Sequence, residues 1–447
     1  MLILLTGATG FLGSRLLPLL RARGHRVLCA GRRAVPGCDF IQADFAHDSE
    51  KSDWVARLSG VEAVINTVGI IRESPGQAFD HLHVRTPRAL FAACAQAGVR
   101  QVIQVSALGA DEGAATAYHL SKKEADDFLA TLPLRSRIVQ PSLVYGPEGA
   151  SARLFRMLAT MPFAVRFGSA PQPVQPVHVE DVCAAIVALL DEKGGPRSAR
   201  VPLVGPAPLP FIGYLAALRR RLGLGRLRVL RLPYSIARAA AWVGGFVPGS
   251  PLTPDTLRML TRGNTADPAA TVRLLGRPPR PVDQFITHPR AERQAAQLDW
   301  LLPLLRLSLA IVWIWTAFVS AFAWPVEDSY RLLARTGVPA LLAPLMLYGA
   351  SALDLAFGIG TLALPPRRRR PLWLAQLALI GFYTVLIALR LPEFLWHPYG
   401  PLSKNLPMLA MIWLLYEMEK EARQEVRHDA RKHAQKTAQK NAHKGNG

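Results

Sequence analysis

Apolar and polar positions alternate in short blocks over the first 145 residues. Five apolar segments have the length of buried strands, and we predict strands at Leu2–Leu5, Arg26–Ala30, Ala63–Thr67, Gln101–Ser106 and Arg137–Gln140. Helical segments fill the intervals, such as Pro87–Ala97, which ends before Gly98. Strands that alternate with helices form a parallel sheet with right-handed crossovers. The pattern therefore predicts an α/β fold with a doubly wound parallel sheet of the Rossmann type.

Residues 146–300 have a mixed pattern that is rich in Pro and Arg and contains no long apolar run. We expect this region to supply a smaller lid over the carboxyl ends of the strands, where ligands of such sheets bind. Sheet and lid together predict a first domain over residues 1–300.

Beyond residue 300, long apolar runs replace the short blocks. They are Leu307–Trp324, Val338–Leu364, Leu372–Leu389 and the shorter Leu406–Tyr416. A membrane span needs about 20 apolar residues, so the first three runs qualify. The fourth spans only if it begins near Leu402, and is otherwise re-entrant. A buried core in a soluble protein is the alternative, but soluble helices rarely stay apolar on all sides over such a length. We predict a four-helix transmembrane bundle at residues 301–418.

The distribution of charge agrees with this division. The 447 residues carry a net charge of +21. The basic residues are dispersed, and they gather beside the apolar runs, at Arg367–Arg370, and in a tail over residues 419–447, whose last part we expect to be disordered. This distribution favours anionic lipid head groups, and not nucleic acid, as the partner of the basic surface.

The same segments predict the topology. Met1 leads directly into the first strand without a basic segment before it, which predicts that the first domain stays in the cytoplasm. Four spans then place Arg367–Arg370 and the tail on the cytoplasmic side, as the positive-inside rule requires. We therefore predict a multi-pass protein of the inner membrane.

A glycine-rich turn follows the first strand and carries the strongest chemical signal. It reads Thr6-Gly7-Ala8-Thr9-Gly10-Phe11-Leu12-Gly13 and leads into a helix. The first glycine permits a tight turn, the second lets the backbone approach a pyrophosphate, and the third lets the helix pack on the strand. Free N–H groups at the helix start then face the phosphates. An ordinary strand–helix turn is the alternative; the position directly after the first strand favours dinucleotide binding by Thr6, Gly7, Gly10, Phe11, Leu12 and Gly13.

Tyr118 and Lys122 form a Tyr-x-x-x-Lys pair on a predicted helix, so that both side chains share one face. A nearby ammonium lowers the pKa of a phenol, which a tyrosine needs if it is to act as acid or base near neutral pH. Ser106 ends the preceding strand, at the edge where the reactive ring of the cofactor would lie. A solvated helix face is the alternative for such a pair, but the glycine turn upstream favours a catalytic site made of Tyr118, Lys122 and Ser106.

Seven sequence pieces occur in the order typical of one superfamily. They are Thr6–Gly13, Asp44-Phe45, Asn66–Gly69, Val105–Gly109, Tyr118–Lys122, Pro141–Pro147 and Val177–Val182. With these pieces the first two-thirds resembles the extended and atypical short-chain dehydrogenases/reductases, above all the NmrA-like and complex I 39-kDa-subunit-like groups.

The resemblance implies roles for individual residues. Asp44 and Phe45 would hold the adenine, and Lys122 would hold the nicotinamide ribose and tune Tyr118, which exchanges the proton. Further cofactor contacts would come from Thr67, Val68, Gly69, Pro141 and Val144. Two departures are visible: extended members place their serine or threonine further from the tyrosine than Ser106, and His83 stands where many relatives carry an asparagine of a proton relay.

The choice of cofactor depends on Arg32 and Arg33, which follow the second strand. Relatives that bind NAD usually carry an acidic residue there for the ribose hydroxyls, whereas the planar fork of arginine suits a 2′-phosphate. We therefore expect NADP(H) in preference to NAD(H); a solvated arginine pair is the alternative. The four cysteines Cys29, Cys38, Cys94 and Cys183 have no metal-ligand spacing, which predicts reduced structural thiols and no metal site.

The apolar third, about residues 301–417, resembles the DoxX-like family through Arg306–Ala310, Leu353–Ala356 and His397–Asn405. This resemblance implies four helices and a loose link to quinone and redox proteins. Asp354 lies inside the second run, where an unpaired carboxylate is costly. Counting depth from the run ends places Arg306 at a similar level, and we expect the two to pair, for structure or for proton or substrate handling.

Two functions follow from these expectations. The first is a membrane-anchored NADP(H)-dependent oxidoreductase for a lipophilic carbonyl, hydroxyl or quinone-like molecule from the bilayer. The second is a non-catalytic NADP(H)-binding sensor or assembly protein that acts on a membrane redox partner, which His83 and the uncertain Ser106 would favour.

Overall fold

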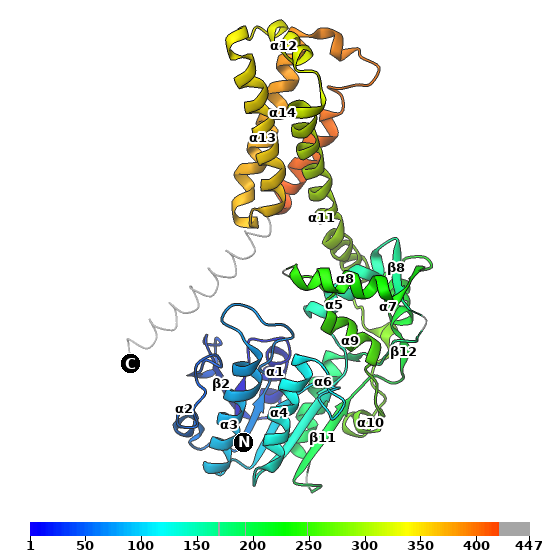
Figure 1. Ribbon diagram of the computed structural model, residues 1–447. Coiled ribbons are helices and arrows are strands. Elements are labelled where there is room, and N and C mark those ends of the chain that lie inside the picture. Colours follow the sequence, from blue (N-terminus) through cyan, green and yellow to red (C-terminus); the bar gives the residue numbers. More distant parts are fainter. Residues whose placement is uncertain (169, 193, 248, 420–447) are drawn as a thin grey trace. The chain divides into compact units, whose positions relative to one another are not determined.

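The computed structural model describes residues 1–168, 170–192, 194–247 and 249–419 (Figure 1). It divides into two compact units, Met1–Gln297 and Leu298–Gly447. The predicted basic tail from Lys420 onward lies outside the described residues.

A seven-stranded sheet of parallel strands forms the centre of the first unit, in the order β11-β6-β5-β4-β1-β2-β3. The strands are β1 Leu2–Thr6, β2 Arg26–Gly31, β3 Asp39–Gln42, β4 Ala63–Asn66, β5 Gln101–Val105, β6 Arg135–Pro141 and β11 Ser198–Leu203. After β3 at one edge of the sheet, the chain crosses back to β4, which pairs with β1 on the side opposite β2. The strand order reverses at this point, and ligands of such sheets bind at the carboxyl ends of the two strands there. The predicted doubly wound α/β sheet is confirmed.

Helices cover both faces of this sheet. On one side lie α1 Gly13–Ala22, α6 Val179–Asp191 and α10 Ala269–Leu275, and on the other α2 Ser52–Val55, α3 Thr86–Gln96 and α4 Ala117–Thr131. Successive residues of β1 alternate between the two cores: Ile3 and Leu5 pack with α1 and α6, whereas Leu4 packs with the opposite layer. Each such fully buried side chain contributes about 1.5–3 kcal/mol, so both faces specify the register of the strand.

The region predicted as a lid is divided between two structures. Its β11 completes the sheet, and its α6 covers one face of the sheet. The sequence pattern did not indicate β11, which has little apolar character and only two buried residues out of six. The rest forms a smaller body with its own core around Tyr214, Leu218 and Phe285. Its helices are α5 Ala150–Thr160, α7 Phe211–Arg221, α8 Tyr234–Phe246 and α9 Pro254–Arg262, and its short strands are β7 Val144–Tyr145, β8 Phe163–Phe167, β9 Pro173–Val174, β10 Val177–His178, β12 Leu209–Pro210 and β13 Arg228–Leu232.

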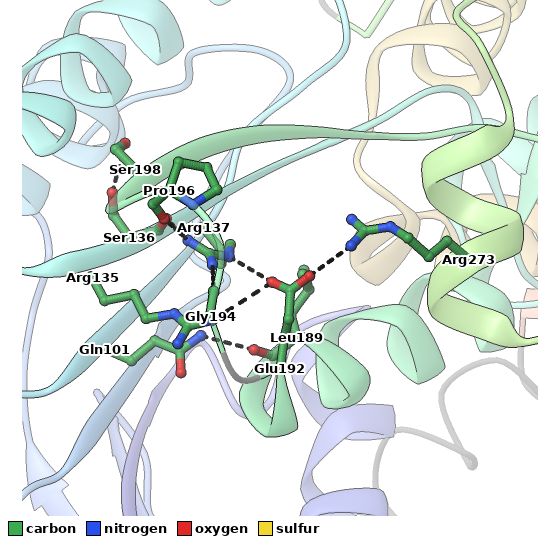
Figure 2. A network of polar contacts seen from close by, with 10 residues as sticks. All are labelled: Gln101, Arg135, Ser136, Arg137, Leu189, Glu192, Gly194, Pro196, Ser198 and Arg273. Atoms are coloured by element: carbon green, nitrogen blue, oxygen red, sulfur yellow. Dashed lines mark hydrogen bonds and ion pairs between the residues drawn. The ribbon is translucent and has the colours of Figure 1, made fainter.

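A buried arginine ties the amino end of β6 to the end of α6 (Figure 2). The side chain of Arg137 is 1% exposed, and its Nε donates to Glu192 at 2.9 Å. Its other donors reach the carbonyl oxygens of Ser136 and Pro196, each at 3.0 Å. On the solvent side, Arg273 also pairs with Glu192, at 2.8 Å. The network lies at the amino ends of the strands, away from the edge where ligands bind.

The second unit is helical. It contains most of α11 Pro289–Phe318, then a wide turn at Val319–Ala323, α12 Val326–Arg335, α13 Ala343–Ala363 and α14 Pro366–Arg390, and short 3-10 turns at Ala340–Leu342 and Pro392–Leu395. Residues 405–419 are also helical. Side chains from these segments share one core, which includes Leu309, Trp313, Phe357, Trp373 and Ile412.

Three helices are long and apolar enough to cross a membrane within the described part of the chain. They span Pro289–Ala323, Ala340–Ala363 and Pro366–Arg390, and at most 28% of their most apolar stretch is buried inside the protein. Their outward apolar side chains fit a lipid environment. The helix at residues 405–419 is not among the three, so the fourth span stays a prediction.

The expected pair between Arg306 and Asp354 is wrong. No ion pair joins them among the described residues, and Arg306 instead lies near Arg369 and Glu419. The Oδ1 atom of Asp354 is buried without a hydrogen-bond partner in the described structure. Depth counted from the sequence could not show which way each residue faces around its helix.

Candidate functional site

Three buried polar side chains join the carboxyl ends of β1, β4 and β5. Thr6 Oγ1 donates to Asn66 Oδ1 at 2.6 Å, and Asn66 Nδ2 donates to Gln104 Oε1 at 2.7 Å. Thr67 Oγ1 donates to the carbonyl oxygen of Thr6 at 2.7 Å. Because buried polar groups cost free energy unless they are hydrogen-bonded, this ladder makes the three strand ends one rigid platform. Two predicted cofactor residues, Thr6 and Thr67, therefore lie side by side.

The glycine turn presents free backbone donors above this platform. Gly10 N–H donates to the carbonyl oxygen of Gly7 at 2.8 Å, whereas the N–H groups of Phe11 and Leu12 have no acceptor in the described chain. Gly7 has a φ of 71°, and a Cβ there would lie 2.7 Å from Thr67 Oγ1. A tight turn that leaves two amides free at the start of α1 fits the pyrophosphate of a dinucleotide.

Gly13→Ala should disrupt this turn. An added Cβ would lie 2.1 Å from the carbonyl oxygen of Gly7 and 2.8 Å from the Cα of Ala8. Both neighbours are backbone, so the turn itself would have to open, at a cost of about 1–3 kcal/mol or more. We expect at least a tenfold loss of dinucleotide affinity in a fluorescence titration. Gly225→Ala is the control, because its added methyl meets nothing within 4 Å; unchanged affinity in Gly13→Ala would contradict the assignment.

Tyr118 lies in the first turn of α4, which is capped by the hydroxyl of Thr116. Its ring contacts three others, with centroid distances of 6.1, 5.7 and 5.2 Å to Phe79, His83 and His119. Burial, reinforced by the charge of Asp126, raises the pKa of Tyr118 to about 12. This is opposite to the lowering by Lys122 that the sequence predicts, because burial dominates; the phenol is protonated at neutral pH, the state that a proton donor needs.

His83 connects the loop after β4 to the turn that carries Tyr118. Ile70 N–H donates to His83 Nε2 at 3.0 Å, so the proton of the neutral ring is assigned to Nδ1, which donates to Ser121 Oγ at 2.9 Å. Ser121 in turn donates to the carbonyl oxygen of Tyr118 at 2.9 Å. Burial, with the charge of Lys122, lowers the pKa of His83 to about 2. Both ring nitrogens are occupied, so that His83 holds the two segments together.

Lys122 extends from α4 to the ends of β4 and β5. Its Nζ donates to the carbonyl oxygens of Val105 at 3.1 Å and Val68 at 3.4 Å. A Cβ on Gly69 would lie 2.8 Å from this Nζ, so a side chain at this position would displace the ammonium. The structure thus brings together Tyr118 and Lys122, spaced i, i+4 on one helix, with the predicted cofactor residues Val68 and Gly69.

Asp126, one helical turn beyond Lys122, is a buried carboxylate that the sequence analysis missed. Ser106 Oγ donates to its Oδ2, and its Oδ1 has no partner within the described residues. Burial raises the pKa of Asp126. Burial likewise lowers the pKa of Lys122, and the charge of Asp126 opposes that shift. The hydroxyl proton of Ser106 is engaged by Asp126, so the catalytic role of Ser106 stays a prediction. The sequence signal that could have identified Asp126 is its i, i+4 spacing from Lys122.

Asp126→Asn should shift the alkaline limb of the pH profile to lower pH. The pKa of Lys122 already lies below its usual 10.5 because of burial, and Asp126 is the charge that supports the ammonium. Without that charge the lysine loses its proton at lower pH, and activity that needs a charged Lys122 falls with it. The measurement is turnover against pH. Asp127→Asn is the control, because Asp127 pairs instead with Lys123 and Arg200; an unshifted limb in Asp126→Asn would contradict this electrostatic role.

Both predicted arginines lie where the second strand ends. Arg32 and Arg33 directly follow β2 and are exposed. The charge of Arg32 acts on Asp44, whose carboxylate also accepts from the N–H of Ala46 at 3.0 Å. The predicted adenine and 2′-phosphate residues therefore lie near each other.

The remaining predicted residues contribute backbone and packing. The ring of Phe45 is buried edge-on to Trp54 at 5.5 Å, so only its backbone could face an adenine. Pro141 is buried at the end of β6, and Val144 begins β7. No cluster of three or more metal-ligating side chains occurs among the described residues.

Comparison with known proteins agrees with this architecture. Residues 3–201 match the NAD dependent epimerase/dehydratase family, and residues 310–413 match the DoxX-like family. The chain joins an NAD-dependent epimerase/dehydratase-type domain to a DoxX-like domain. The predicted resemblances to short-chain dehydrogenases and to the DoxX-like family are confirmed.

Two curated relatives match the first domain. A ceramide reductase of Caulobacter vibrioides is 30% identical over 191 residues, covering 42% of this chain and 60% of that protein. A mitochondrial NADH dehydrogenase [ubiquinone] 1 alpha subcomplex subunit 9 of Arabidopsis thaliana is 28% identical over 247 residues, covering 53% of this chain and 61% of that protein. The matches thus span about 60% of the length of these relatives.

Among solved structures, an NADPH-dependent quinone oxidoreductase of Escherichia coli in complex with NADPH has a TM-score of 0.51 and 20% identity. The match covers 63% of this chain and 97% of that one. This likeness supports the fold of the first unit.

Proposed function

We propose that this protein is a membrane-anchored NAD(P)(H)-dependent oxidoreductase of the short-chain dehydrogenase type, which acts on a lipophilic carbonyl, hydroxyl or quinone-like molecule. The observation that carries the proposal is the placement of Tyr118 one helical turn from Lys122, whose Nζ reaches the sheet edge that also bears the glycine turn. The DoxX-like domain and the apolar helices would keep this site at a bilayer.

The site suits reduction of a carbonyl group. A reduced nicotinamide would supply the hydride to the carbonyl carbon. Tyr118 would give its proton to the carbonyl oxygen as the alcohol forms, and the ammonium of Lys122 would stabilise the phenolate left behind. The relative named a ceramide reductase supports a lipid as the substrate class. We place the first domain on the cytoplasmic side of the inner membrane, on the grounds of the basic Arg367–Arg370 segment.

Arg32 and Arg33 favour NADPH as the cofactor. A combined Arg32→Ala/Arg33→Ala change should weaken NADPH binding by about 10- to 100-fold, because charge-assisted hydrogen bonds to a phosphate contribute about 1.5–3 kcal/mol. Binding of NADH should stay unchanged, since it lacks the 2′-phosphate. Titration of both nucleotides against the detergent-solubilised chain tests this, with Arg100→Ala, another exposed arginine, as control. Equal losses for both nucleotides would contradict a 2′-phosphate site.

A non-catalytic NADP(H)-binding protein that assembles with or signals to a membrane redox partner is the second candidate. The observation that favours it is His83, whose two ring nitrogens are both engaged in holding segments together. The subunit 9 relative of an NADH dehydrogenase supports it too. NADPH that binds stoichiometrically but is not consumed with lipid carbonyls or quinones would select this candidate.

A further inference from the structure

Helix α8 of the first unit packs through its small residues and turns its large apolar residues outward. Ala237, Ala241 and Gly244 are its buried positions, spaced along one stripe. The contact is close, because a Cβ on Gly244 would lie 2.0 Å from the carbonyl oxygen of Leu252. An amphipathic helix in water shows the reverse pattern, with its large apolar residues inside.

The opposite side of α8 is mainly apolar. At 100° per residue, the exposed residues that lie opposite the buried stripe are Ser235, Ile236, Ala239, Trp242, Val243 and Phe246, and we term the five apolar ones the α8 face. Trp242, Val243 and Phe246 are 63%, 55% and 72% exposed. The rings of Trp242 and Phe246 contact each other, with centroids 4.9 Å apart. Exposed apolar patches with large side chains mark sites that meet a partner or a membrane.

The sequence segment that contains α8 carries charges of one sign. The segment from Arg226 to Pro254 contains no Asp or Glu. Its four arginines are exposed, and none forms an ion pair in the described chain: Arg226, Arg228, Arg231 and Arg238. A helix with Trp and Phe on its apolar side and unpaired cations beside it has the composition of helices that lie in the interface of anionic membranes.

We propose that the α8 face docks on the surface of an anionic lipid bilayer. The same chain carries three helices that are suited to span a membrane, so a bilayer is a surface that this chain itself would meet. The positive charge beside the face fits anionic head groups. The same charge would repel the Lys- and Arg-rich segment after residue 419, so that segment is a poor candidate for the partner that covers the face.

Helix α9 connects the docked α8 to the candidate site. Leu257 of α9 packs against Ala237 and Ala241 of α8. At the other end of α9, Arg262 donates to the carbonyl oxygen of Gly109 at 2.9 Å and to Asp111 at 2.5 Å, in the loop that leads to α4. A lipid substrate would therefore leave the bilayer beside the loop before Tyr118; this last step rests on the proposed function, whereas docking itself does not.

The test uses the full chain in nanodiscs, with an environment-sensitive fluorophore on a cysteine introduced by Val243→Cys. Ser52→Cys at the start of α2, also exposed, is the matched control, and the unsubstituted chain reports background labelling of its four buried cysteines. Spin-labelled lipid then quenches a probe that lies in the bilayer, and acrylamide quenches one in water. Discs are prepared with phosphatidylcholine alone or with added phosphatidylglycerol.

We expect lipid quenching at position 243 to exceed that at position 52 at least twofold, and to rise with phosphatidylglycerol. The combined Arg228→Gln/Arg231→Gln/Arg238→Gln change should remove the dependence on phosphatidylglycerol. A probe at 243 that acrylamide reaches as readily as at 52 overturns the proposal, and so does a probe shielded from both quenchers, which would mean that protein covers α8. Because the readout needs no turnover, failure here is distinct from failure of the oxidoreductase proposal.

Discussion

Turnover should fall about 10²- to 10⁴-fold when Tyr118 is replaced by phenylalanine, the range that a positioned general acid contributes. The change removes only the hydroxyl, and the ring keeps its contacts with Phe79, His83 and His119. No hydrogen bond of the hydroxyl occurs among the described residues, so its removal breaks none. The measurement is NADPH oxidation by the reconstituted full chain with a long-chain lipid carbonyl or a quinone.

The affinity for NADPH separates chemistry from folding in this variant. Since the glycine turn, and not Tyr118, is the proposed phosphate site, we expect the dissociation constant of Tyr118→Phe to stay within about twofold of that of the unsubstituted chain. Tyr234→Phe makes the same chemical change on an exposed tyrosine and should leave turnover intact. Full activity in Tyr118→Phe would refute the proton-donor role, and loss of NADPH binding would refute the assignment of a purely chemical effect.

The parts of the site that could be predicted lie within short continuous motifs. The glycine turn and the spacing of Tyr118 and Lys122 each depend on at most eight consecutive residues, where local backbone geometry determines the arrangement. His83 could not be assigned in this way, because its partners Ile70 and Ser121 lie 13 and 38 residues away. Its role as a connector depends on how the loop after β4 meets α4, which is a tertiary contact.

Strand β11 and the exposed face of helix α8 escaped prediction from the sequence for a common physical reason. Strand β11 has little apolar periodicity, and helix α8 buries alanine and glycine while exposing tryptophan and phenylalanine. Sequence patterns identify elements through the burial of large side chains. They fail where an edge strand is half exposed, or where a helix face meets something other than the protein core.

Glu192→Gln should destabilise the first unit by about 3–5 kcal/mol, because it leaves the buried guanidinium of Arg137 without its counter-ion. Glutamine keeps the shape of the side chain and one acceptor, so the loss is that of charge. Hydrogen–deuterium exchange of peptides from β6 and β11 in the full chain reports this free energy locally. Arg273→Ala is the control, since Arg273 approaches the same carboxylate from solvent with 63% of its side chain exposed, and such a pair contributes about 0–1 kcal/mol.

The same network predicts a dependence on pH with a definite sign. Burial alone would raise the pKa of Glu192, but hydrogen bonds from Arg137 and Arg273 outweigh it and hold the pKa below its usual 4.5. A carboxylate with a depressed pKa in the folded state adds stability above that usual value, and the contribution is lost as the pH falls through the folded-state pKa. The exchange rates of β6 and β11 should therefore approach those of Glu192→Gln in acid. A combined Arg137→Met/Glu192→Leu change removes both charges and should recover most of the stability that Glu192→Gln loses; if it is as unstable as Glu192→Gln, packing and not the uncompensated charge is the cause.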